Sequence, residues 1–382
     1  MTQVGIKLSM TKICFAKLTG ALLAAVSLAA SALSAFAIES TMPTDKYPDV
    51  VKPELAAKYK YTEDGEFSQK IGIPTYEWMP AEGPPKAVIV GVHGLTLHGR
   101  RFRVLARALA INNIGFVSFD MRGFGRCNFE NKWSTTKNDR SKVHLEKSYE
   151  DLEQLTTLVK ERYPDAKIVL LGESLGCTFC VRLAGEHPDL VYGIVLSAPA
   201  VKVNADMIVG AGNLKRGIKA AVSPHHEMDL NPFIRNLVSG RKQVTAEMLD
   251  DPLITKKLTL GALLSTDAFV DHTAKWGKKT SDKLPVLIIQ GSRDECVSPK
   301  HVTDLMANMP SVDQTLSWKG QFGHLQLETQ YLRTEVLEAL VDWMYDHGAE
   351  NQIQVANFAQ SINDLGGSVV RYSAPNTVAD DK

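Results

Sequence analysis

The chain has 382 residues, enough for one large α/β domain with an insertion or for two domains. Its 43 lysine and arginine residues balance 43 aspartate and glutamate residues, and its apolar fraction is ordinary for a globular protein. This balance speaks against a nucleic-acid partner or an acidic substrate. We find no internal repeat and no cysteine spacing typical of a zinc site.

The first 37 residues have the pattern of a secretory signal peptide. Three lysines precede an uncharged stretch at 18–37 that is rich in alanine, leucine and serine and ends in Ala-Phe-Ala. We therefore expect an exported protein, periplasmic or secreted, that is cleaved after Ala37, with translation starting at Met1 or Met10. An uncleaved membrane anchor is the alternative, because the stretch is just long enough to span a bilayer.

Four cysteines remain after such a cleavage, and export would allow them to form disulfides. Spacing alone does not decide which residues would pair. Cys177 and Cys180 lie one turn apart in a predicted helix, where buried free thiols serve as small apolar side chains. We expect no disulfide between these two or with Cys127 and Cys296.

Residues 38–65 are polar and contain prolines, which indicates an extended lead-in to the folded domain. Residues 67–79 suit one or two antiparallel edge strands. Apolar runs typical of strands buried on both faces then alternate with amphipathic helices. In chain order these are strand 87–92, helix 102–109, strand 116–119, helix 144–163, strand 167–171, helix 177–187 and strand 191–196. The alternation predicts a mostly parallel sheet with helices on both faces, in a first core part at 66–200.

The alternation stops between residues 201 and 283, where we find helical pieces and no buried strand. A second core part follows at 284–348. Its elements are a strand at 286–289, a strand at 316–318 and a helix at 329–347. An insertion of roughly eighty residues between two strands of one sheet predicts a helical lid. Residues 349–382 are polar and weakly patterned, and we expect a tail to which we assign no role.

The stretch Gly-Glu-Ser-Leu-Gly at 172–176 has the G-x-S-x-G pattern between a predicted strand and a predicted helix. Such a tight turn forces the serine into a strained backbone conformation, and the small flanking residues leave room for the strand and helix. The strain lifts the hydroxyl clear of the sheet, and the helix N-terminus favours negative charge there. The bare pattern occurs by chance in many proteins, but this context makes Ser174 the candidate nucleophile.

A serine hydroxyl needs a base to take its proton, and the base needs an acid that orients it. Groups that reach Ser174 in a parallel sheet follow the carboxyl ends of other strands. Asp294 follows the strand at 286–289, and His324 follows the last strand. The order serine, aspartate, histidine is typical of this architecture. The alternatives are a turn or N-cap aspartate at 294, Glu295 as the acid, and an ordinary surface histidine at 324.

Acyl chemistry also needs donors for a tetrahedral oxyanion. One is the backbone N–H that follows the nucleophile, which belongs to Leu175. The second donor is expected in the loop after the strand at 87–92, and we choose the N–H of Leu95. His93 and His98 in this loop suggest metal ligands, but no acidic residue is placed with them, so we favour a packing role.

Several motifs occur together in the expected order. They are His93-Gly94, Asp120-Met-Arg-Gly-Phe-Gly125, Gly172-Glu-Ser-Leu-Gly176, Gly291-Ser-Arg-Asp294 and Gly323-His324. From about residue 66 to 347 the chain resembles the α/β-hydrolases of the monoacylglycerol lipase group. This group includes bacterial lysophospholipase-like enzymes and borders the serine aminopeptidase-like hydrolases. The stretch Asp-Pro-Leu-Ile at 251–254 is similar to one in these lipases and favours the lid assignment.

The resemblance implies an α/β-hydrolase fold, with a mostly parallel central sheet and an inserted helical lid. It also implies an ester-hydrolysing triad of Ser174, Asp294 and His324, an oxyanion hole at Leu95 and Leu175, and no metal or other cofactor. Two positions depart from the group, which usually has histidine at position 173 and glycine at position 177; here they are glutamate and cysteine. The departures leave the triad intact and bear on substrate preference.

The leading hypothesis is an exported serine hydrolase that cleaves the ester of a single-chain lipid, a monoacylglycerol or a lysophospholipid. A general esterase or thioesterase, or an aminopeptidase-like hydrolase, is the alternative among enzymes. An aminopeptidase would need an acidic residue to hold the substrate ammonium; the candidates are Glu227, Asp229, Asp250 and Asp267. The third hypothesis is a non-catalytic binding protein on the same fold, although such proteins commonly lack the nucleophile or the histidine.

The predicted lid carries two apolar stripes, one around residues 233–237 and one at 260–269. Most of these side chains would pack the lid on the core, and we expect Leu263, Leu264 and Phe269 to roof a substrate pocket. A transient contact between the lid and a membrane surface would follow from this apolar face. We expect activity to be lost as His324 is protonated, near or below its ordinary pKa of about 6.5. The sequence leaves the oligomeric state open.

Overall fold

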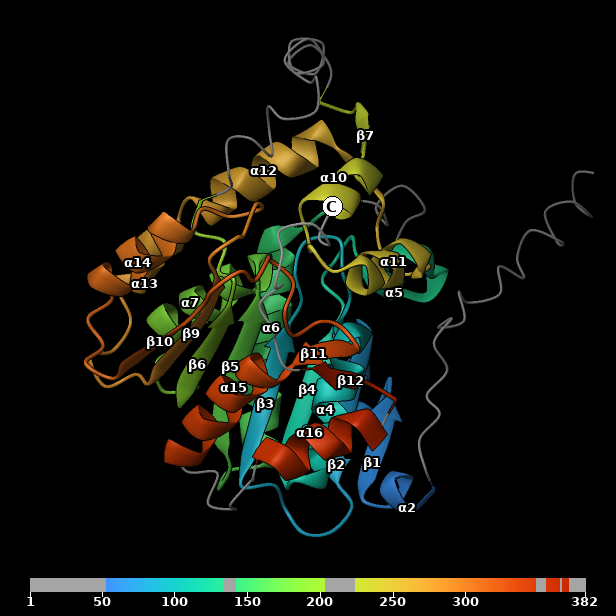
Figure 1. Ribbon diagram of the computed structural model, residues 1–382, viewed down its shortest axis with the longest axis vertical. Helices are drawn as coiled ribbons and strands as arrows, with labels where there is room; N and C mark the ends of the chain where they lie inside the picture. Colours follow the sequence, from blue (N-terminus) through green and yellow to red (C-terminus); the bar gives the residue numbers. More distant parts are fainter. Residues whose placement is uncertain (1–52, 134–141, 203–223, 348–354, 365, 371–382) are drawn as a thin grey trace, which may run out of the picture. The chain divides into compact units, whose positions relative to one another are not determined.

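The computed structural model describes residues 53–133, 142–202, 224–347, 355–364 and 366–370 (Figure 1). An eight-stranded sheet lies at the centre, in the order β1-β2-β4-β3-β5-β6-β9-β10. The strands are β1 (Tyr59–Glu63), β2 (Thr75–Pro80), β3 (Ala87–Val92), β4 (Ile114–Phe119), β5 (Lys167–Glu173), β6 (Gly193–Ser197), β9 (Val286–Gly291) and β10 (Gln314–Lys319). Strands β1 and β2 are antiparallel to their neighbours, and all other pairs are parallel. The predicted α/β fold with a mostly parallel sheet is confirmed.

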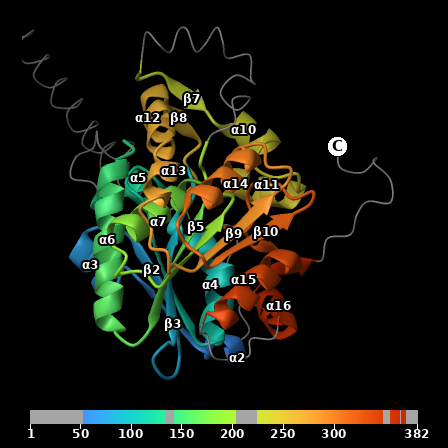
Figure 2. The ribbon, with the colours of Figure 1, turned by 90° about the vertical axis from the view of Figure 1, so that its left-hand side faces the viewer.

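Helices cover both faces of the sheet (Figure 2). One face carries α3 (Glu66–Ile71), α6 (Leu145–Arg162), α7 (Leu175–Glu186), α13 (Thr273–Gly277) and α14 (Pro299–Asn308). The other face carries α4 (Arg103–Ile111), α15 (Thr334–Asp346) and α16 (Val355–Asp364). Because successive strand residues point to opposite faces, Val88 and Val90 join the first core and Ile89 joins the second. Both faces are apolar, which explains the continuous apolar runs of the central strands.

The start of the fold differs from the prediction. Residues 59–63 form the edge strand β1 rather than part of an extended lead-in, and α2 (Pro53–Ala56) precedes it. Residues 66–71 form the helix α3, and residues 67–79 supply one antiparallel strand, β2, of the one or two expected. Most of β1 is exposed, and an edge strand of that kind needs no apolar pattern. The predicted signal peptide and the first part of the lead-in lie outside the described residues.

Short elements complete the loops at the carboxyl ends of the strands. They are the 3₁₀ helices η1 (Gly99–Phe102) and η2 (Asn131–Trp133) and the helix α5 (Gly125–Phe129). Within the residues that the structure describes, no helix has both the length and the hydropathy to cross a bilayer.

The segment between β6 and β9 contains short strands as well as helices. Its described part holds β7 (Glu227–Asp229), α10 (Asn231–Asn236), α11 (Lys242–Asp250), β8 (Lys257–Thr259), α12 (Leu260–Val270) and α13. Strands β7 and β8 pair antiparallel, so the expectation of helical pieces alone was wrong. Each strand has only three residues, too few to show an alternating apolar pattern in the sequence. Residues 203–223 of the predicted lid lie outside the description.

Part of the predicted polar tail is folded against the core. After β11 (Tyr331–Arg333) and α15, the helix α16 packs on α4 and α15, and β12 (Ser368–Val370) pairs parallel with β11. Ile362 in α16 is fully buried. The apolar positions 355, 358 and 362 follow a helical period, a signal that the polar composition of the segment masks. The tail prediction was therefore wrong for residues 355–370; residues 371–382 are not described.

The buried position of Ile362 leads to a prediction about stability. Replacing it with alanine removes apolar contacts and leaves a cavity between α16 and α4, which typically costs about 2–5 kcal/mol. We expect Ile362→Ala to lower the free energy of unfolding by this amount in urea denaturation. Gln360→Ala changes an exposed side chain of the same helix and is the control. Equal stabilities of the two variants would contradict the packing of α16.

Candidate active site

The turn that carries the candidate nucleophile joins β5 directly to α7. Strand β5 ends at Glu173, helix α7 begins at Leu175, and Ser174 between them has φ 55° and ψ −117°. A side chain at positive φ costs about 1–3 kcal/mol and persists only where the surroundings impose it. A Cβ at Gly172 would lie 2.5 Å from the nitrogen of Cys177, and one at Gly176 would overlap the carbonyl oxygen of Val92. Only glycine fits at positions 172 and 176, two residues before and two residues after Ser174.

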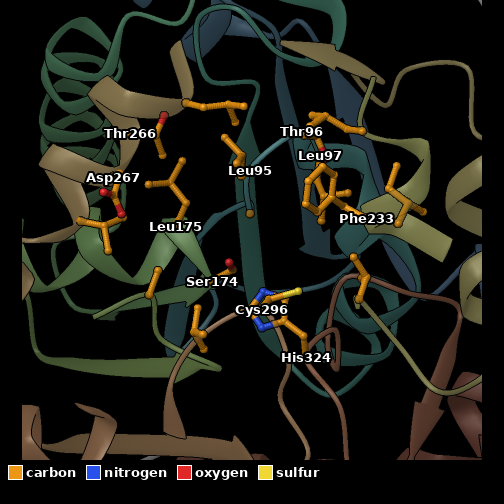
Figure 3. A pocket seen from close by; sticks show the side chains of 18 of the residues that line it. Leu95, Thr96, Leu97, Ser174, Leu175, Phe233, Thr266, Asp267, Cys296 and His324 are labelled. Carbon is orange, nitrogen blue, oxygen red and sulfur yellow. The ribbon is translucent and has the colours of Figure 1, made fainter. Parts of the chain in front are cut away.

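The end of strand β6 holds this turn in place. The backbone N–H of Ser174 donates to the carbonyl of Ser197 at 2.9 Å, and Ala200 N–H donates to the carbonyl of Ser174 at 3.2 Å. The strained conformation is thus fixed by the neighbouring strand, and the hydroxyl lies at the floor of a pocket (Figure 3).

Asp294, placed just past β9, both shapes its turn and holds the histidine. Its Oδ1 accepts the N–H groups of Cys296 at 2.9 Å and Val297 at 3.0 Å. Its Oδ2 accepts Nδ1–H of His324 at 2.8 Å. Asp294 therefore has both of the roles considered from the sequence: Oδ1 stabilises its own turn, and Oδ2 orients the histidine. Glu295, the competing carboxylate, is exposed.

His324 is buried and lines the same pocket as Ser174 (Figure 3). With Nδ1 donating to Asp294, Nε2 is left as an acceptor for the serine proton. Burial lowers the pKa of His324, but the negative charges of Asp294 and Glu173 outweigh it, so the pKa lies above the ordinary 6.5. The pKa is thus shifted upward, mainly by Asp294, from the value on which the expected pH range near or below 6.5 was based.

The two predicted oxyanion donors border this pocket. Leu175 is the first residue of α7, so its N–H has no acceptor within the helix. Among the described residues, no acceptor contacts the N–H of Leu95, which follows the end of β3. The loop of Leu95 is held by the Gly94 N–H, which donates to Glu328 Oε2 at 2.8 Å, and by Met121 N–H, which donates to His93 Nε2 at 2.9 Å. Burial lowers the pKa of His93 to about 3, which keeps this imidazole neutral and able to accept.

The inserted segment is anchored beside the same loop through buried charges. His98 Nε2 contacts Asp251 Oδ2 at 3.0 Å, and Arg101 lies 3.3 Å from Asp251 and 3.1 Å from Glu247. Burial alone would raise the pKa of Asp251, but His98 and Arg101 hold it well below its usual range. Asp251 is therefore the acidic partner of His98 that the sequence analysis did not identify. The partner is distant in the chain, and only its place in the Asp-Pro-Leu-Ile motif signalled it.

The pocket above Ser174 has a volume of about 230 Å³. Ser174, His324, Leu95, Leu175, Cys296 and Ala200 lie around its floor. Most other lining residues are apolar and come from the loop after β3 and from the inserted segment: Leu97, Met228, Leu230, Phe233, Ile234, Val238, Met248, Leu260, Leu263, Leu264 and Val270. Thr96, Thr266 and Asp267 add polar groups.

Of the three predicted roof residues, Leu263 and Leu264 line the pocket and Phe269 does not. Phe269 packs against Phe179 of α7, with ring centroids 4.9 Å apart, and against Trp276 at 5.1 Å. Positions 263 and 270 share one side of α12, because seven residues make nearly two full turns, and position 269 is turned away from it. The prediction for Phe269 was wrong because it treated the apolar residues at 260–269 as one face of the helix. Of the four acidic candidates, Asp267 alone is among the described pocket-lining residues.

The ligand atoms of Asp294, Cys296 and His324 lie within 4.8 Å of one another, close enough to suggest a metal site. The donor set fits a metal poorly. Asp294 and His324 already share a hydrogen bond, and burial raises the pKa of the Cys296 thiol well above its usual value, which disfavours the thiolate that a metal requires. Cys296, like Cys127, Cys177 and Cys180, is free and buried.

Comparisons with known proteins agree with this geometry. Residues 83–329 match the family described as "Serine aminopeptidase, S33". Monoglyceride lipase of Mus musculus is 28% identical over 273 residues, covering 70% of this chain and 84% of that protein. Monoacylglycerol lipase of Mycolicibacterium smegmatis is 23% identical over 281 residues, covering 71% of this chain and 91% of that protein.

Solved structures share the fold. The crystal structure of Paleococcus ferrophilus monoacylglycerol lipase has a TM-score of 0.58 at 22% identity, and the match covers 72% of this chain and 98% of that one. A soluble variant of monoglyceride lipase from Saccharomyces cerevisiae has a TM-score of 0.57 at 17% identity, with 73% and 89% covered. The chain therefore belongs to the serine aminopeptidase S33 family of α/β-hydrolases and is a serine hydrolase similar to monoacylglycerol lipases.

Proposed function

We propose that the protein cleaves the carboxylic ester of a single-chain lipid, a monoacylglycerol or a lysophospholipid, with Ser174, His324 and Asp294 as its triad. The observation that carries the proposal is the pocket whose floor holds Ser174 and His324 and whose walls are mostly aliphatic. An acyl chain can lie along such walls while its ester carbonyl reaches the serine. The named relatives, monoglyceride lipases of 28% identity or less, favour the same substrate class.

In the proposed reaction, Ser174 Oγ attacks the ester carbonyl carbon while its proton passes to Nε2 of His324. The carbonyl oxygen becomes an oxyanion that accepts hydrogen bonds from the N–H groups of Leu95 and Leu175. Collapse breaks the bond to the alcohol, which takes the proton from His324 and leaves an acyl-serine. Water then attacks the acyl group with His324 again as the base, and the fatty acid is released from Ser174.

Asp267 favours a second candidate among the enzymes. It lines the pocket, and burial together with the nearby Asp271 raises its pKa. When ionised it can hold the ammonium of a small aminoacyl substrate, as an aminopeptidase requires. A comparison of aminoacyl nitroanilides with monoacyl esters separates the two candidates, and faster cleavage of the anilides would favour the aminopeptidase.

We further propose that the protein is exported, with residues 1–37 removed as a signal peptide, and that the inserted segment acts as a lid with transient contact to a membrane surface. The Ala-Phe-Ala sequence supports cleavage after Ala37. Leu264, which is 55% exposed, supports the membrane contact. The mass of the chain recovered from the exported fraction tests the cleavage: a chain that keeps residues 1–37 would exclude it.

The nucleophile assignment predicts that Ser174→Ala abolishes hydrolysis of a nitrophenyl ester. The oxyanion donors and the pocket would still leave about 10³–10⁴-fold acceleration over water. Covalent labelling by a fluorophosphonate should be lost in the same variant. Ser265→Ala, on the exposed side of α12, serves as the control. Turnover near that of the wild type in Ser174→Ala, or a wild-type protein that resists the label, would overturn the assignment and favour a non-catalytic protein.

The raised pKa of His324 predicts the pH dependence of activity. Only the neutral imidazole can accept the serine proton, so kcat/KM should fall as the pH drops through a midpoint above 6.5. Asp294→Asn removes a charge that raises this pKa and should move the midpoint downward, while lowering kcat by about 10⁴-fold. A wild-type midpoint clearly below 6.5 in a pH series with a nitrophenyl ester would contradict this account.

The aliphatic walls predict a preference for longer acyl chains. Burial of each methylene is worth about 0.8 kcal/mol, or about fourfold in kcat/KM. We expect kcat/KM to rise over several carbons in a series of monoacyl esters, and Leu263→Asn to flatten the rise. Ala268→Ser changes an exposed residue of α12 outside this pocket and is the control. Fastest cleavage of acetyl or propionyl esters would indicate a small-ester esterase instead.

A further inference from the structure

Glu173, the residue before the nucleophile, is fully buried, and its carboxylate is surrounded by hydrogen-bond donors. Oε1 accepts Ser197 Oγ–H at 2.9 Å and Gln326 N–H at 2.6 Å. The N–H of Leu327 lies 3.0 Å from Oε1 and 3.1 Å from Oε2, and Glu328 N–H donates to Oε2 at 2.7 Å. Every one of these contacts is a donor, so the pattern suits an ionised carboxylate and leaves no place for its own proton.

These donors locate the role of Glu173. Three of them are consecutive peptide N–H groups that begin two residues after His324. The carboxylate that receives them is covalently next to Ser174. The Glu173 side chain therefore links the backbone that follows His324 to the backbone at Ser174. A shift of either segment would break these hydrogen bonds.

Glu328 extends the connection to the oxyanion loop. Its Oε2 accepts the Gly94 N–H at 2.8 Å, one residue before Leu95. Its Oε1 is buried and has no hydrogen-bond partner among the described residues. Burial and the negative Glu173 raise the pKa of Glu328 well above its usual value. Burial also raises the pKa of Glu173, against its four donor groups. Because four donors surround the Glu173 carboxylate and one reaches that of Glu328, a negative charge shared by the pair is better stabilised on Glu173.

Few titratable groups lie close to Glu173 and His324. The titratable groups that face Glu173 are His324, Glu328 and the thiol of Cys177, and burial keeps that thiol protonated. Those that face His324 are Asp294, Glu173 and Cys296. Asp294 and Glu173 are therefore the two negative charges that act on the imidazole.

We propose that Glu173 is a positioning residue for the reaction: its carboxylate fixes His324 relative to Ser174 and supplies a second negative charge that stabilises the imidazolium. Glu328 carries the same restraint to the loop of Leu95. This inference rests on the proposed function, in which His324 accepts a proton during catalysis. A histidine, the usual residue of the resembled group at this position, cannot accept three backbone N–H groups, so this role depends on the glutamate of this chain.

The test compares uncharged variants by pH profile and by the separation of kcat from KM. Glu173→Gln keeps the shape but presents an NH₂ group to backbone donors. We expect kcat to fall by about 10- to 100-fold, since displacement of a catalytic group by about 1 Å costs about 10²-fold, while KM changes little. The pH midpoint of activity should also move downward. Glu173→Gln/Glu328→Gln should move it at least as far, because Glu328 can no longer take up the charge.

Glu328 provides the matched controls. Glu328→Gln keeps an acceptor for Gly94 and should change kcat and the pH midpoint less than Glu173→Gln does. Glu328→Ala removes the acceptor and should lower kcat without moving the midpoint. Thermal melting identifies variants that fail to fold. For that case Ser197→Ala, which removes a single donor from Glu173, should give a smaller shift of the midpoint in the same direction, downward, because a donor that favours the carboxylate over the acid is lost.

Two results separate failure of this inference from failure of the proposed function. If wild-type activity does not depend on Ser174, the proposed function fails. If activity depends on Ser174 but Glu173→Gln retains the kcat and the pH midpoint of the wild type, the positioning role of Glu173 is overturned alone. A fall in kcat with an unchanged midpoint in both Glu173→Gln and the double variant would also overturn it, since that result describes a purely structural side chain.

Discussion

Buried peptide N–H groups need acceptors, and this constraint governs the loops at the carboxyl ends of the strands. The loops of Ser174, His324 and Leu95 are covered by the inserted segment, so most of their peptide groups cannot use water. Carboxylates supply the acceptors. Asp120 receives Gly99 N–H at 2.8 Å and Arg126 N–H at 2.7 Å, and Glu173, Asp294 and Glu328 serve other loops in the same way. Each carboxylate joins segments that are distant in sequence, which keeps catalytic groups in register.

Buried carboxylates also attach the inserted segment to the core, here through ion pairs with an arginine. Arg101 lies between Glu247 and Asp251, and all three side chains are buried. Removing one partner from such a cluster would leave an uncompensated charge in the interior, which proteins tolerate poorly. The segment is therefore fixed at its base near Asp251. Leu264 of α12 is exposed, so the roof of the pocket is less enclosed than its base.

The sequence predicted features whose signal is local. The strands β3, β5 and β9 are continuous apolar runs, and Ser174 lies in a motif whose strand and helix are adjacent in the chain. Features that depend on distant partners were missed. The sequence did not indicate that Asp251 contacts His98 or that Glu328 binds Gly94, because each pair forms only after folding. The exposed strand β1 lacks an apolar pattern, and Phe269 lies on a different side of α12 from Leu263.

The packing of α16 on α4 has a consequence for how the chain folds. These helices lie far apart in the sequence, and Ile362 completes the core that α4 shares with β3 and β4. Before α16 docks, that side of the sheet keeps part of its apolar surface uncovered. Contacts between distant segments slow folding, and uncovered apolar surface promotes association with other chains. Docking of α16 thus closes this core, and chains that lack the helix would be prone to aggregate.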